Sequence, residues 1–172
     1  MRNKTLVLVL TWIGLAALAR LLPHPPNVTP VAAMALFAGC YLADRRWACA
    51  VPLLAMLLTD VVLGFHSTQP YVYAAFLLMV GLGRWLSRHY ATGNIVLASL
   101  SGSLLFFALT NYGVWATQNM YPHTAAGLVL CYIAALPFFH YTALGDLFYS
   151  ALLFGTAALL LRPRAVNAAQ SI

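Results

Sequence analysis

Charged side chains are too scarce in this chain to cover the surface of a water-soluble domain. Charged residues make up 7% of the sequence and apolar residues 63%, and three of the 172 residues are acidic. Soluble domains carry about 25% charged residues. The composition therefore predicts an integral membrane protein whose apolar side chains face lipid. The length suits about six membrane helices of roughly 20 residues each, so we expect residues 1–172 to form a single membrane domain.

Several functional classes find no support in the sequence. The basic residues that give the net charge of +6 lie mostly in pairs at the ends of apolar segments, which is typical of topology signals and not of a nucleic-acid surface. No glycine-rich phosphate loop, HExxH zinc motif or Gly-x-Ser-x-Gly elbow occurs. The cysteines, Cys40, Cys49 and Cys131, lack the CxxC spacing of metal sites. We therefore expect no enzyme activity, no cofactor, no metal site and no nucleic-acid partner.

Prolines and basic turns divide the chain into apolar segments. We expect an all-α polytopic fold with six transmembrane helices, over the ranges 6–22, 30–42, 47–65, 71–87, 95–117 and 142–161. The segment Ala125–Phe139 is predicted to be a separate re-entrant or interfacial helix on the outer side. Pro137 and the polar cluster at 140–142 would divide it from the last span.

The positions of the basic residues decide between six crossings and seven. With six, every basic residue except Arg20 falls on one side of the membrane, and that side is cytoplasmic by the positive-inside rule. Seven crossings would place the C-terminal arginines outside. We therefore predict a multi-pass protein of the bacterial inner membrane with both termini in the cytoplasm. The residues on the inner side are Arg2, Lys4, Arg45, Arg46, Arg84, Arg88, Arg162 and Arg164.

Polar side chains gather near the outer ends of the predicted helices. Asp60 and Asp146 lie inside apolar runs, where an ionisable group is costly and marks a candidate functional site. Asn111 lies at a similar depth, and Arg20 lies near the outer end of the first helix. We expect both carboxylates to be buried in the protein, with Arg20 as the counter-ion of one of them. The serines around position 101 are interpreted as helix-packing residues.

Two interpretations account for this concentration of polar groups. In the structural one, the charges pair with each other and the aromatic residues form an interfacial belt. In the functional one, which we favour, they form a pocket that opens to the outside. Aromatic rings would stack on a planar solute there, while amide, carboxylate and imidazole groups orient it. The candidate substrate-binding residues are Asn27, Asp60, His66, Gln69, Tyr71, Asn111, Tyr112, Trp115, His140 and Asp146.

Four stretches of the chain carry a resemblance to known transport proteins. They are PPNVTPVAAMALFAG at 25–39, VPLLAMLLTD at 51–60, TNYGVW at 110–115 and LGDLFY at 144–149. The first two resemble the substrate-binding S-components of energy-coupling factor transporters. The whole pattern, over about residues 20–155, looks like an uncharacterised family of bacterial transport proteins.

The resemblance implies an S-component-like bundle that binds a small, water-soluble, vitamin-like nutrient from the outer face. Lipid and an energy-coupling transporter module are the partners that it implies. The Ala-x-x-x-Ala coupling motif of the first helix is absent, and the pair Ala35 and Gly39 on the second helix is the nearest equivalent. Solitary cobalamin-binding S-components are the nearest functional analogy, so cobalamin is one candidate solute that the resemblance implies, and His66 would then be the residue to approach its cobalt. A non-transport scaffold or assembly subunit is the alternative function, and an intramembrane enzyme is a third.

Overall fold

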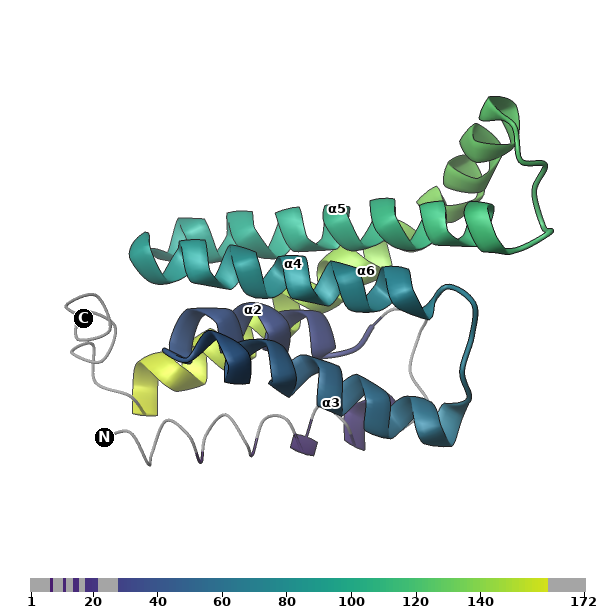
Figure 1. Ribbon diagram of the computed structural model, residues 1–172. Helices are drawn as coiled ribbons and strands as arrows, with labels where there is room; N and C mark the ends of the chain where they lie inside the picture. The colour runs from purple at the N-terminus through teal and green to yellow at the C-terminus, as the bar shows by residue number, and fades with distance from the viewer. Residues whose placement is uncertain (1–6, 8–10, 12–13, 16–17, 22–27, 161–172) are drawn as a thin grey trace.

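The computed structural model describes residues 7, 11, 14–15, 18–21 and 28–160, and every structural statement below concerns these residues. Within them the chain forms helices joined by short turns, and no strand (Figure 1), which confirms the predicted all-α class. The described residues of the first segment, up to position 21, are helical. Five helices follow: α2 (Val31–Tyr41), α3 (Arg45–Leu63), α4 (Gln69–Arg88), α5 (Thr92–Thr117) and α6 (Ala125–Leu160).

Local sequence signals set several helix ends close to the predicted positions. The side chain of Asp44 accepts a hydrogen bond from the backbone N–H of Arg46 at 2.8 Å, which caps the start of α3. Gly64 ends α3 with a φ angle of 98°, a conformation that other residues rarely adopt. Pro70 lies in the first turn of α4, where a backbone N–H would have no helical acceptor, so proline costs no hydrogen bond there.

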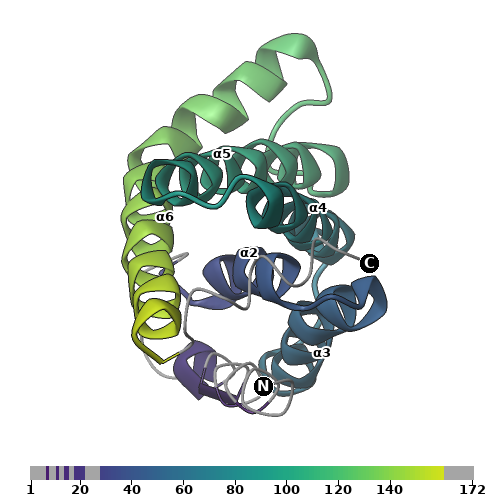
Figure 2. The same ribbon diagram turned by 90° about the vertical axis from the view of Figure 1, so that its left-hand side faces the viewer.

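The last helix differs from the sequence-based expectation. The sequence predicts a break between Ala125–Phe139 and the final span, but α6 is one continuous helix of 36 residues that contains Pro137. A proline inside a helix removes one backbone hydrogen bond and bends the helix without necessarily ending it. The first turns of α6 lean away from α5, and its remainder runs along the bundle (Figures 1 and 2). At 1.5 Å per residue α6 is about 54 Å long, so it exceeds the ~30 Å hydrocarbon core of a bilayer.

The short helix α2 forms the core of the bundle. It packs against α3, α4, α5 and α6, which surround it in Figure 2. A helix that is apolar on all sides is expected to be buried on all sides, and α2 follows this rule. Its buried residues are Val31, Ala33, Met34, Ala35, Leu36, Phe37, Ala38, Gly39 and Cys40.

Two glycines bring α2 and α4 into close contact. A Cβ atom added at Gly39 of α2 would overlap the backbone of Val80, and one added at Gly83 of α4 would overlap the backbone of Leu36. Small residues permit this approach of two backbones in membrane proteins. Gly39 therefore belongs to an internal packing face, and Gly83 is its partner on the facing helix.

Three of the described helices, α3, α5 and α6, are long and apolar enough to cross a membrane. The exposed face of α3 is apolar as well, since Leu58, Val61 and Val62 are each about two-thirds exposed, at 67%, 67% and 70%. Water would not favour such a surface, whereas lipid does. The fold therefore supports a membrane protein.

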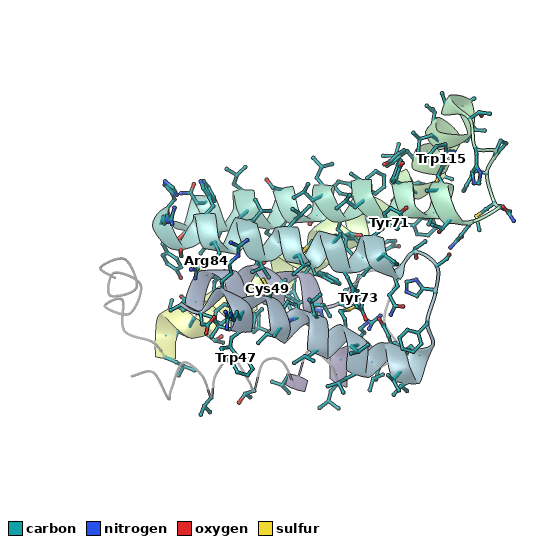
Figure 3. The ribbon with its side chains drawn as sticks, viewed as in Figure 1. Trp47, Cys49, Tyr71, Tyr73, Arg84 and Trp115 are labelled. Carbon is teal, nitrogen blue, oxygen red and sulfur yellow. The ribbon has the colours of Figure 1, made fainter. Side chains whose placement is uncertain are left out.

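The two ends of the bundle differ in chemistry. Arg84 and Trp47 lie toward one end, and Tyr71, Tyr73 and Trp115 lie toward the other (Figure 3). Arg84 Nη1 donates to the backbone oxygen of Leu42 at 2.8 Å, which ties α4 to the turn between α2 and α3. The described basic residues of the turns before α3 and α5 thus share one end, as the positive-inside pattern requires.

Candidate functional site

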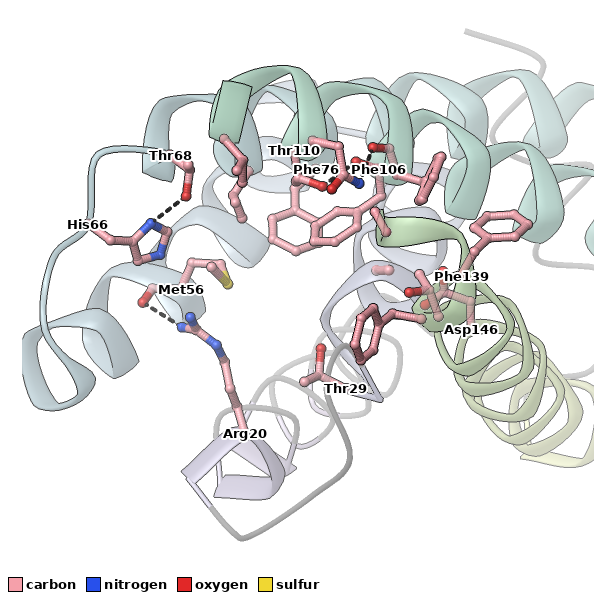
Figure 4. A pocket seen from close by; sticks show the side chains of 18 of the residues that line it. Arg20, Thr29, Met56, His66, Thr68, Phe76, Phe106, Thr110, Phe139 and Asp146 are labelled. Atoms are coloured by element: carbon pink, nitrogen blue, oxygen red, sulfur yellow. Dashed lines mark hydrogen bonds between the residues drawn. The ribbon is translucent and has the colours of Figure 1, made fainter. Parts of the chain in front are cut away.

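A cavity of about 470 Å³ lies among the first segment, α2, α3, α4, α5 and α6 (Figure 4). It is on the side of the α3–α4 turn, away from the basic turns. Its apolar wall consists of Ala32, Met56, Leu63, Val72, Phe76, Phe106, Phe107, Val114, Ala135, Phe138 and Phe139. Its polar wall consists of Arg20, Thr29, His66, Thr68, Thr110, Asn111, Thr142 and Asp146. A concave, mostly apolar space with a few polar groups is the usual makeup of a small-molecule site.

Asp60 is buried beside this cavity and is held by side chains from the first segment and from α4. Arg20 Nη1 lies 2.6 Å from Asp60 Oδ1. The Tyr73 hydroxyl donates to Asp60 Oδ2 at 2.8 Å, and Gln69 Nε2 donates to the same oxygen. Arg20 also donates to Thr59 Oγ1. These contacts confirm that Asp60 is buried and that Arg20 neutralises one of the two membrane carboxylates.

Arg20 and Asp60 differ in their position relative to the cavity. Arg20 lines the cavity, whereas Asp60 and Gln69 lie behind it. Asp60 holds Arg20 in place on the wall through the ion pair, and Gln69 and Tyr73 both donate to Asp60. A carboxylate that is 0% exposed needs such partners, because an unpaired buried charge is strongly destabilising.

Asp146 is the second buried carboxylate, and it lines the cavity directly. It is 3% exposed, which confirms the prediction that it does not face lipid. Ser103 Oγ of α5 donates to its Oδ2 at 2.6 Å. Over the described residues, no cation lies within ion-pair distance of Asp146. Its environment therefore differs from that of Asp60, which has both a cation and two further donors.

A small polar network extends from Asp146 between α5 and α6. Ser103 Oγ is also 3.1 Å from the backbone oxygen of Ser99, and Ser150 Oγ of α6 donates to Ser99 Oγ at 3.2 Å. The sequence predicts packing roles for the serines of α5, and Ser99 and Ser103 are indeed buried between helices. It does not reveal that Ser103 contacts the carboxylate, because the two residues are 43 positions apart.

Phenylalanine rings form the aromatic part of the wall. The ring of Phe76 on α4 lies 5.6 Å from that of Phe106 on α5, centroid to centroid. The rings of Phe107 on α5 and Phe139 on α6 meet edge to face at 5.1 Å. Three helices thus converge on the cavity through these rings. The sequence does not single out the rings of α5 and α6, since the apolar residues of these two helices show no helical period.

Two more of the predicted residues line the cavity. His66, in the α3–α4 turn, is exposed, and its Nδ1 lies 2.8 Å from Thr68 Oγ1. Asn111 is half-buried on α5, and its Nδ2 donates to the backbone oxygen of Phe107 at 2.8 Å. With Asp146, the structure brings together three of the predicted residues on the wall itself.

The predicted aromatic residues lie elsewhere. Tyr71 packs on α5, where a Cβ atom at Gly113 would come within 2.6 Å of its ring. Tyr112 stands between Tyr71 and Trp115, with ring centroids at 5.9 and 5.5 Å. Trp115 Nε1 donates to the backbone oxygen of Pro122 at 2.9 Å and so holds the α5–α6 turn.

His140 also lies apart from the described wall. The ring of His140, on α6, contacts that of Tyr141 with centroids at 4.0 Å, and His140 is exposed. Asn27 lies outside the described residues. A role for Asn27, His140 and the three aromatic residues in binding stays a prediction.

No metal-binding cluster is present in the described part of the chain, where no three His, Cys, Asp or Glu side chains converge. The cavity therefore offers hydrogen bonds, one ion-paired guanidinium, one carboxylate and aromatic surface. This chemistry suits the reversible binding of an organic solute.

The chain belongs to a family of unknown function (DUF6580), whose family model matches residues 1–169. No curated protein and no solved structure matches the chain.

Proposed function

We propose that this protein binds a small, water-soluble nutrient in the cavity from the outer face of the bacterial inner membrane, as part of its uptake. One observation carries the proposal: a buried carboxylate, Asp146, lines a cavity of about 470 Å³ without a cation among the described residues. A carboxylate in an apolar helix is costly and marks substrate pathways in membrane proteins. The volume falls within the roughly 300–1,000 Å³ of typical ligand sites.

The alternative is a scaffold or assembly subunit whose polar residues only stabilise the bundle. The cluster around Asp60 fits that role, since its carboxylate, Arg20, Gln69 and Tyr73 contact each other. Asp146 fits a scaffold role less well than the Asp60 cluster does. A purely structural bundle gains nothing from a large cavity beside a carboxylate, because protein interiors are close-packed.

The orientation of the cavity agrees with a receptor for an external solute. The cavity lies on the side of the α3–α4 turn, and the described arginines of the other turns lie at the opposite end. The positive-inside rule assigns the arginine end to the cytoplasm. The cavity then faces outward, as in the S-components that the sequence resembles.

The size of the cavity bears on the candidate solutes. A cobalamin, with its corrin ring and nucleotide tail, is far larger than a compact vitamin built on one or two rings. A volume of about 470 Å³ favours the compact solute. The release of the solute by an energy-coupling module is a separate part of the proposal. The close contact of α2 and α4 is internal packing and is no evidence for such a module.

A ligand screen by thermal shift tests the proposal. The full chain, purified in detergent, is heated with each member of a library of vitamins and small nutrients, since a bound ligand raises the melting temperature by mass action. We expect at least one compact nutrient to stabilise the protein and to be taken up by cells that express it. If no member of a broad library shifts the melting temperature, the scaffold alternative replaces this proposal.

A further inference from the structure

We infer that the cavity takes an organic cation, a compact solute whose positively charged nitrogen pairs with Asp146 and whose apolar part lies among the phenylalanine rings. The inference rests on the proposed function and adds the chemical class of the solute. Charge balance, hydrogen-bond polarity and the nature of the aromatic wall support it separately.

The charges around the cavity do not cancel. Arg20 brings one positive charge, and Asp60, 2.6 Å away, compensates it. The carboxylate of Asp146, when ionised, brings a second negative charge, and no described cation lies within ion-pair distance to compensate it. A solute with one positive charge would complete the balance, whereas an anion would compete with Asp60 for Arg20.

The hydrogen-bonding groups on the wall also favour a donor. Asn111 Nδ2 already donates to Phe107 O at 2.8 Å, and Thr110 Oγ1 donates to Phe106 O at 2.7 Å. Among the described residues the side-chain oxygen of Asn111, Oδ1, makes no hydrogen bond. The Thr110 hydroxyl proton and one of the two N–H groups of Asn111 are therefore used within α5, and the side-chain oxygens of both residues remain as acceptors. A protonated amine, which only donates, matches such a surface.

The aromatic wall suits a cation more than a neutral polar solute. Five phenylalanines line the cavity, and Figure 4 labels one of them, Phe139, beside Asp146. Both residues belong to α6, about two turns apart. The face of an aromatic ring carries partial negative charge and attracts a cation within about 6 Å. A phenyl ring has no hydroxyl or indole N–H that would bond to the solute instead. The five residues are Phe76, Phe106, Phe107, Phe138 and Phe139.

The test uses four probes of similar shape with the full-length protein in detergent. Benzylammonium and benzyltrimethylammonium are cations, benzyl alcohol is the neutral analogue, and benzoate is the anion. Binding is measured by thermal shift and by competition with any nutrient found in the screen. We expect both cations to stabilise the protein and to bind about tenfold or more tightly than benzyl alcohol, since a charge-assisted contact is lost in the alcohol. Benzoate should not compete.

Variants then assign the charge effect to one residue. Asp146→Asn should weaken benzylammonium binding about tenfold while benzyl alcohol binding stays the same. Asp44→Asn is the matched control, because it removes the same charge from an exposed turn and asparagine remains a good helix cap. Phe139→Leu should weaken benzyltrimethylammonium, which cannot donate a hydrogen bond and depends on the rings.

The outcomes separate this inference from the proposed function. If benzyl alcohol or benzoate binds as tightly as the cations, or if folded Asp146→Asn retains full cation affinity, the organic-cation class is wrong while solute binding stands. If Asp146→Asn does not fold, the comparison of the cation with the alcohol in the unaltered protein decides alone. If neither the probes nor any member of the nutrient library binds, both the organic-cation class and the proposed function are wrong.

Discussion

Arg20 and Asp60 form an ion pair, with Nη1 of the guanidinium 2.6 Å from Oδ1 of the carboxylate. The pair joins the first segment to α3 beside the cavity. Because Arg20 is committed to this partner, the positive charge on the cavity wall is already compensated. The second carboxylate, Asp146, is the group on which the proposed binding depends.

The ion pair itself can be tested by removing one charge. Asp60→Asn should lower the free energy of unfolding by roughly 3–5 kcal/mol, because it leaves the largely buried guanidinium of Arg20 without its counter-ion. The measurement is thermal or chemical unfolding in detergent. Asp44→Asn is the control and should change stability little.

A double variant separates the pair from other effects of the substitution. Arg20→Gln combined with Asp60→Asn should lose less stability than the two single variants added together, since neither charge remains unpaired. Strict additivity of the two single losses would show that the charges do not interact.

The close contact of α2 and α4 predicts a large effect of one methyl group. Gly39→Ala should destabilise the protein by about 1–3 kcal/mol, because the new Cβ would overlap the backbone of Val80 and push the helices apart. Gly81→Ala, on α4, is the control, since a Cβ there has no neighbour within 4 Å. The control should be neutral or stabilising by up to about 1 kcal/mol, as alanine favours helix. Equal effects at both positions would contradict the close approach of the two backbones at Gly39.

The hydrogen bond from Ser103 to Asp146 predicts a cost in stability. Ser103→Ala removes the donor that the described structure gives to this buried carboxylate, and an unsatisfied buried group costs about 1–3 kcal/mol. Ser101→Ala, half-buried on the same helix, is the matched control and should have little effect. A loss at Ser101 as large as that at Ser103 would mean that small-residue packing, and not the carboxylate contact, explains the serines.

The sequence predicts much of the fold because its signals are local. Charged turns, prolines and apolar runs place α2 to α5 within a few residues of their observed ends. The continuity of α6 across Pro137 does not follow from the sequence, since a proline can bend a helix or end it, and tertiary contacts decide which. Here Tyr132, about two turns into α6, donates to the backbone oxygen of Ala108 at 2.7 Å, which ties this part of α6 to α5.

The candidate site is predictable only in part. Buried charges are rare in an apolar chain, so Asp60, Asp146 and their counter-ion Arg20 stand out. Which aromatic residues face the cavity depends on how helices pack, and apolar helices carry no period that tells one face from another. The sequence therefore points to Tyr71 and its aromatic neighbours, whereas phenylalanines form the wall.

The arrangement of the two ends predicts which residues are accessible from outside the cell. Ser67, in the α3–α4 turn, and Arg46, at the start of α3, are both exposed and lie at opposite ends of α3. In a background without Cys40, Cys49 and Cys131, we expect Ser67→Cys to react with a membrane-impermeant thiol reagent on whole cells. Arg46→Cys should react only after the membrane is opened, because basic turns stay in the cytoplasm. Labelling of Arg46→Cys on intact cells would show that the orientation is the opposite one. The cavity would then face the cytoplasm, which excludes capture of an external nutrient.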